Sequence, residues 1–253
     1  MKPVIRKPEE ELVSPDSEYH IVYVRNPFTC FLHWLLVFAI IGLSLSGLYI
    51  GSPELFFGQG AEAYNNFIMA KMRFIHFAFA SILVLSLLLR LYFSFKPACR
   101  KDIHDIIPTW NNLKMAVELA VYYVTLKGGH AHFRFINPIG GIAIFLMIIL
   151  FIGEIVTGFT LYFQGANSFT WGWALVVTDR IEILLGGTPN VRLIHHLITW
   201  VLLAMVIIHI YMQIWKDLYF PEAGIASIIA GYKIFHKDII KKHIDRYKAR
   251  LLN

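Results

Sequence analysis

The segment RLIHHLITWVLLAMVIIHIYMQIW, residues 192–215, is long and apolar enough to cross a lipid bilayer, yet it contains three histidines. About 20 helical residues span the roughly 30 Å hydrocarbon core of a membrane. Ionisable side chains are rare inside such helices, and those that occur usually have a function. The segment therefore predicts a membrane helix that carries part of a functional site.

The rest of the chain has the same character. Its 253 residues are 57% hydrophobic and 16% charged, with a mean hydropathy of +0.58, which is more apolar than an ordinary soluble domain. Three further stretches are long enough to span, at about 29–50, 74–95 and 138–163. We expect an all-α, integral membrane four-helix bundle. It forms a single membrane domain over residues 1–253, with no internal repeat.

Lysine and arginine are distributed unequally between the two sides of these spans. One side, made of the N-terminal tail, the segment from Arg90 to Arg134 and the chain from Lys216 onward, holds 19 of them, and the other side holds 4. Basic residues near span ends are retained in the cytoplasm. The sequence therefore predicts cytoplasmic tails, 1–28 and 216–253. The basic residues reflect this topology and contact with anionic membrane lipid, not nucleic acid.

Three shorter segments lie between or after the spans. Residues 112–124 and 224–235 are too short to cross and are interpreted as interfacial helices on the cytoplasmic side. Residues 173–187 lie outside and mix charges with aliphatic side chains. A simple interfacial loop is the favoured interpretation there; a short surface helix or a docking surface for another protein are alternatives.

The histidines of the spans fall at two depths. His33 lies near the cytoplasmic end of the first span and His209 toward that end of the fourth, whereas His76 lies near the outer end of the second span, level with His195 and His196. We expect an outer layer and an inner layer, each with one histidine from each of two helices.

Helix geometry selects one residue of the adjacent pair as a ligand. His195 and His209 are 14 positions apart, so they share a face and are separated by about 21 Å along the axis, while His196 turns away from that face. This spacing leaves room for two stacked haems, each held by two imidazoles, an arrangement that favours electron transfer over oxygen binding. Zinc fits less well, because neither layer offers a tetrahedral set of ligands.

Arginines occur one turn outward from the two outer histidines. Arg73 and Arg192 each precede a predicted ligand by three residues and could bind a haem propionate through two hydrogen bonds. Arg25 and Lys216 could act in the same way on the inner side. The alternative for all four is an ordinary charged anchor whose head group reaches the membrane surface.

The chain resembles the cytochrome b subunit of membrane-bound nickel–iron hydrogenases, within a di-haem superfamily that includes formate dehydrogenase gamma subunits. The resemblance covers roughly residues 20–220 and is carried by YVRNPFTCFLHW, RFIH, GHAHFRFINPIGG, EIVTGFTLY and RLIHHLITWVLLAMVIIHIY. It implies two b haems in a protein of the bacterial inner membrane. On this resemblance the axial ligands of the iron are His33, His76, His195 and His209.

The resemblance also implies partners. An iron–sulfur small subunit of the hydrogenase, with its large subunit, would dock on the outer face, in a complex that could contain several copies. Electrons would pass through the outer and inner haems to a quinone such as menaquinone. The chain would thus be the electron-transfer subunit of a hydrogen:quinone oxidoreductase, with the hydrogen-activating metals in its partner. The quinone-site candidates are His130, His132 and Asn137, which offer hydrogen bonds and a proton relay.

Two other functions stay open. The chain could be the cytochrome b subunit of a different periplasmic dehydrogenase, or a haem-free transporter that uses its histidines as a proton relay. The relay would require ionisable groups through the middle of the membrane, where the sequence supplies only Glu154. We expect Glu154 to form a hydrogen bond to a neighbouring helix or haem edge, with a role in a proton path as the alternative.

Overall fold

The four predicted spans are helices in the structure, a computed structural model that describes residues 19–23, 25–53, 67–95, 106–125, 137–164, 168–219 and 224–236. They are α1 (Pro27–Gly51), α3 (Ile68–Ser94), α6 (Pro138–Tyr162) and α8 (Thr188–Tyr219). All four are long and apolar enough to cross a membrane. This confirms the all-α membrane bundle, although α3 and α8 begin several residues before the apolar stretches that predict them.

Two of the spans begin with the same capping device. Asn26 precedes Pro27 at the start of α1, and its side chain accepts a hydrogen bond from the Phe28 N–H at 2.9 Å. Asn137 precedes Pro138 at the start of α6 and accepts one from the Gly140 N–H at 2.6 Å. Asparagine satisfies a free N–H at a helix start, and proline has no N–H to satisfy there.

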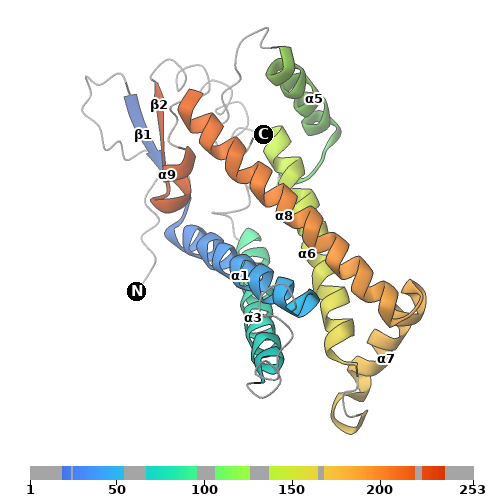
Figure 1. Ribbon diagram of the computed structural model, residues 1–253. Helices are drawn as coiled ribbons and strands as arrows, with labels where there is room; N and C mark the ends of the chain where they lie inside the picture. Colours follow the sequence, from blue (N-terminus) through green and yellow to red (C-terminus); the bar gives the residue numbers. More distant parts are fainter. Residues whose placement is uncertain are drawn as a thin grey trace.

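The spans form two closely packed pairs, α1 with α3 and α6 with α8 (Figure 1). Glycines allow the close approach. Gly42 of α1 lies directly against the Phe79 ring of α3, and a Cβ at Gly153 of α6 would come within 3.0 Å of Ile198 of α8. Small residues at such contacts are typical of membrane helices, which gain little from burying apolar side chains against one another.

Little of the apolar surface is buried within the chain. Only 6–17% of the residues in each span are buried, and large apolar side chains such as Phe38, Leu45 and Ile207 are exposed. Several of the buried side chains are polar instead, among them Ser46, Ser86, Thr157 and Thr160. The apolar exterior therefore needs lipid, a cofactor or other subunits to cover it.

The shorter elements follow the predictions in part. α5 (Trp110–Thr125) is the expected helix, but residues 173–185 of the segment 173–187 lie in α7 (Ser168–Leu185), so the favoured loop interpretation was wrong. The helix predicted over 224–235 is α9 only from Gly224 to Ile229, and it ends just before Gly231, whose φ is +85°. Glycine adopts such a value without strain.

A small sheet follows α9. β2 (Tyr232–His236) pairs antiparallel with β1 (Tyr19–Tyr23), with Ile21 opposite Ile234. The strand segments YHIVY and YKIFH are rich in the aromatic and β-branched residues that favour strands. The sheet, α9 and one end of α1 lie together (Figure 1). We call this the α9 end of the bundle and the opposite one the α7 end.

Candidate cofactor site between the helix pairs

The structure brings the four predicted histidines together as two pairs. His76 of α3 lies within electrostatic range of His195 of α8, and His33 of α1 lies within electrostatic range of His209 of α8. We call the first the α7-side pair and the second the α9-side pair. Each pair joins one helix of the α1–α3 unit to the same helix, α8, of the other unit.

Both histidines of the α7-side pair are held through the same ring nitrogen. The Ser46 hydroxyl donates to the Gly42 carbonyl at 2.6 Å and lies 3.0 Å from His76 Nδ1. The Thr157 hydroxyl donates to the Gly153 carbonyl at 2.7 Å and lies 2.9 Å from His195 Nδ1. Because each hydroxyl has given its hydrogen to a carbonyl, it can act only as an acceptor toward the imidazole. Nδ1 then carries the proton, and Nε2 has a lone pair for a metal.

Glycines make room for both rings. A Cβ at Gly47 would lie 3.2 Å from His76 Cε1, and a Cβ at Gly158 would lie 3.3 Å from His195 Cε1. Each glycine directly follows the hydroxyl residue that contacts the ring. The rings thus lie in cradles that any larger residue would fill. Fixed rings with a free Nε2 and space at Cε1 fit the axial ligation of a haem iron.

The two cradles are parts of a repeat that the sequence reading missed. In α1 and in α6, Asn-Pro is followed at a constant distance by the pattern G-x-x-x-[ST]-G, written GLSLSG and GEIVTG, with an offset of 111 residues. The partner helices α3 and α8 carry RFIH and RLIH. The pattern is short and degenerate, so it becomes evident as a repeat only when both copies are seen to hold a histidine.

One feature of the α7-side pair occurs in the second copy only. The Glu154 carboxylate of α6 lies 2.7 Å from His195 Nδ1 through Oε2 and accepts a hydrogen bond from the Thr199 hydroxyl at 2.9 Å through Oε1. Glu154 therefore bonds to a neighbouring helix, as expected from the cost of an isolated acid in a span. Leu43 and Ala80 take the corresponding positions of the first copy.

The α9-side pair lies among cations. Arg25 is within electrostatic range of both His33 and His209, and Arg90 of α3 is within range of His33. Arg90 was not among the predicted cofactor residues. The sequence feature that could have identified it is its spacing: Arg90 follows His76 by 14 residues, as His209 follows His195, and therefore shares a helix face with His76.

The other predicted residues have more varied surroundings. His196 is exposed, with its ring 3.6 Å from the position of a Cβ at Gly51 at the end of α1 and its ring centroid 6.3 Å from that of His195. Arg73 and Arg192 are both exposed. Asn137 caps α6 at the predicted cytoplasmic end, and His130 and His132 lie outside the described residues.

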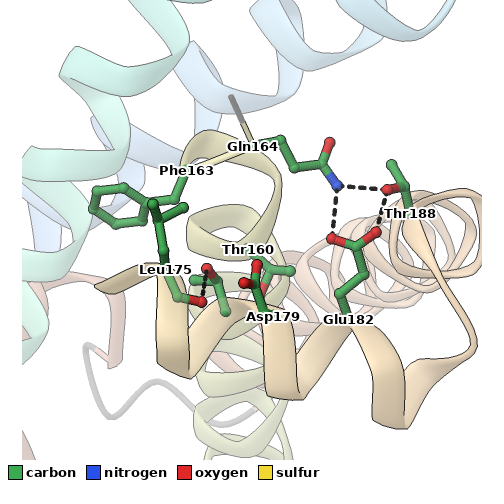
Figure 2. A pocket seen from close by; sticks show the side chains of 8 residues that line it. Thr160, Phe163, Gln164, Leu175, Asp179, Glu182 and Thr188 are labelled. Atoms are coloured by element: carbon green, nitrogen blue, oxygen red, sulfur yellow. Dashed lines mark hydrogen bonds between the residues drawn. The ribbon is translucent and has the colours of Figure 1, made fainter. Parts of the chain in front are cut away.

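A polar cavity of about 310 Å³ lies at the α7 end, between α6, α7 and the start of α8 (Figure 2). Glu182 of α7 accepts a hydrogen bond from the Thr188 hydroxyl at 2.5 Å and one from Gln164 at 3.5 Å, and Gln164 also donates to Thr188 at 2.9 Å. This cluster connects α7 to the end of α6 and the start of α8.

Four spans with histidines held in pairs between them define a multi-pass membrane protein of the haem-binding kind. The chain belongs to the prokaryotic cytochrome b561 family, whose model matches residues 24–231. It is accordingly a bacterial b-type cytochrome with haem b as its cofactor.

Curated relatives cover most of the chain. A probable Ni/Fe-hydrogenase B-type cytochrome subunit of Rhizobium leguminosarum bv. viciae is 31% identical over 86% of this chain and 91% of its own length. The protein of the same description from Cupriavidus necator is 27% identical over 90% and 93%. The Ni/Fe-hydrogenase 1 counterpart of Escherichia coli K12 is 27% identical over 79% and 86%.

Proposed function

We propose that the chain is the membrane subunit through which a nickel–iron hydrogenase delivers electrons to quinone, with two b haems in its two histidine layers. The observation that carries this proposal is the pairing of the histidines, at two depths, with ring nitrogens held so that Nε2 is free in the α7-side pair. The names of the relatives support a hydrogenase as the partner.

The residues of each layer would have distinct tasks. His76 and His195 would ligate one iron and His33 and His209 the other. Bound haem supplies a one-electron redox centre. Arg73 and Arg192 on the α7 side would bind its propionates, and on the α9 side Arg25 and Arg90 would do so. A guanidinium binds a carboxylate through two hydrogen bonds, so these contacts would orient the haem edge as well as neutralise it.

The two ends of the bundle would face different partners. With 19 of the 23 basic residues at the α9 end and in its adjoining loops and tails, that end is cytoplasmic and the α7 end lies outside. The hydrogenase small and large subunits would therefore dock at the α7 end. A quinone would be reduced near the α9 end, where Asn137, His130 and His132 are the candidates for its hydrogen bonds and protons.

The test is a reduced-minus-oxidised difference spectrum with pyridine haemochrome quantitation on the detergent-purified chain. We expect about two low-spin b haems per chain, and about one in His195→Ala and in His209→Ala. His196→Ala, which changes the neighbouring imidazole, is the matched control and should keep both. A folded, haem-supplied chain without a Soret band would refute the proposal in favour of a histidine proton relay.

The partner needs a separate experiment. Affinity purification of the chain from its native membrane should bring down a nickel-containing large subunit and an iron–sulfur small subunit, and the isolated complex should reduce a menaquinone analogue with hydrogen. Copurification of a formate dehydrogenase, or of another dehydrogenase, would keep the di-haem assignment and replace the partner.

A further inference from the structure

The two ligands of the α7-side pair are held by unequal partners. His76 Nδ1 has the neutral Ser46 hydroxyl at 3.0 Å, whereas His195 Nδ1 has the Thr157 hydroxyl at 2.9 Å and the Glu154 carboxylate at 2.7 Å. The hydroxyls belong to the repeat, but the carboxylate does not, because its counterpart in the first copy is Leu43. The structure thus adds a charged group to one ligand of an otherwise repeated scaffold.

The carboxylate is fixed in place on both of its oxygens. Oε2 lies 2.7 Å from His195 Nδ1, and Oε1 accepts a hydrogen bond from the Thr199 hydroxyl, whose oxygen also lies 3.0 Å from the His195 carbonyl oxygen. Glu154 and His195 are both largely buried, with side chains 15% and 16% exposed. Water therefore screens their contact weakly, and the carboxylate has one orientation toward the ring.

We propose that Glu154 is the positioning residue that sets the reduction potential of the haem held by His76 and His195. This inference rests on the proposed haem ligation. A carboxylate that accepts the Nδ1 proton increases the electron donation of the imidazole through Nε2, and its negative charge favours the more positive ferric iron. Both effects lower the potential of this haem and leave the other haem, whose ligand His209 lies about 21 Å further along α8, largely unaffected.

The experiment is a redox titration of the purified, haem-loaded chain at one fixed pH, followed in the haem absorbance and in the low-spin ferric EPR signals. In Glu154→Gln, which keeps the shape but removes the charge, we expect the ferrous form of one haem to be favoured about tenfold, equivalent to about 59 mV for one electron. The other haem should not move. Glu154→Asp, which restores a carboxylate, should recover most of the wild-type potential.

The matched control is Ser46→Ala, which removes the neutral hydroxyl from the other ligand of the same iron. It should shift the reduction potential much less than Glu154→Gln does. It should still change the EPR signal, because the His76 ring loses the hydroxyl that orients it. Equal shifts in the two variants, or an unmoved potential in Glu154→Gln with both haems bound, would overturn the proposal. If Glu154→Gln loses a haem, Glu154→Asp must retain it, and a loss in both overturns the proposal as well.

The outcomes separate this inference from the function on which it rests. If the wild-type chain binds two haems and Glu154→Gln has the same reduction potentials, the positioning role alone is refuted. A wild-type chain that binds no haem refutes the proposed function and the positioning role together.

Discussion

An imidazole that binds a metal through one ring nitrogen is oriented by whatever meets the other. In the α7-side pair that partner comes from the preceding span, since Ser46 of α1 faces His76 of α3, and Thr157 of α6 faces His195 of α8. Each hydroxyl is fixed in turn by the carbonyl four residues earlier. The tautomer of each of these two imidazoles is thus set by the packing of two helices, before any cofactor binds.

The glycine beside each ring gives a direct test of the cradle. In Gly158→Val the new side chain would begin 3.3 Å from His195 Cε1, and overpacking of this kind costs about 1–3 kcal/mol. We expect the haem content of the purified chain to fall by about half, measured by pyridine haemochrome. Gly172→Val in α7, where nothing lies within 4 Å of a new Cβ, is the control and should retain full haem.

A residue-scale prediction also applies to the α9-side pair. Arg90 lies within electrostatic range of His33, and a nearby cation favours ferrous over ferric iron. Arg90→Gln should therefore lower the reduction potential of this haem by up to about 59 mV, which corresponds to an equilibrium constant for reduction about three- to tenfold smaller. Arg90→Lys keeps the charge and should shift it less. A redox titration in which the two variants behave alike would contradict an electrostatic role.

At the scale of elements, the sequence predicted the membrane helices, which long apolar runs determine. It missed the strands, which form by pairing of segments far apart in the chain. All four spans followed from hydropathy, and the assignment of His195 and His209 to one face followed from helical periodicity. The strand at Tyr232–His236 did not, because five residues form a strand only when Tyr19–Tyr23 lies beside them. The helix α7 was not the favoured prediction because of the charges at Asp179, Arg180 and Glu182, which an exposed surface helix tolerates.

The cofactor site shows the same division. The histidines were identifiable because an imidazole in a membrane span is unusual. The groups that orient them were not, because serine, threonine and glycine are common in membrane helices for packing alone. Only the contacts of Ser46 and Thr157 distinguish them from the many other small polar residues of the spans. Glu154 was conspicuous as a buried acid, but its pairing with His195 required the structure.

The attachment of α9 makes an element-scale prediction. Asp217 of α8 accepts hydrogen bonds from the N–H groups of Gly224 at 2.7 Å and Ile225 at 2.8 Å, and so caps the first turn of α9. Loss of a helix cap costs about 0.5–2 kcal/mol. In Asp217→Ala we expect faster amide hydrogen exchange over residues 224–236, with the core of α8 unchanged. Asp179→Ala, an exposed acid of α7, is the control and should leave that exchange as in the wild type.

At the scale of the whole molecule, the two histidine pairs lie at opposite ends of one membrane-spanning bundle. The spans bury few of their residues within the chain, so the bundle depends on surrounding lipid, cofactor and subunits more than a soluble four-helix bundle does. The layers can connect an outer donor with an inner acceptor only if the α7 end faces outward. The orientation of the chain is therefore a condition of the proposed electron route.

This orientation can be measured with single cysteines in a chain whose Cys30 and Cys99 are replaced by serine. Asp179→Cys in α7 and Glu118→Cys in α5 both replace exposed acids, which contribute little to topology, and leave every basic residue in place. A membrane-impermeant maleimide should label the first in intact spheroplasts and the second only in inverted vesicles. The reverse pattern would place the α7-side pair at the cytoplasmic face, and electrons from an external hydrogenase would then have to enter at the α9 end.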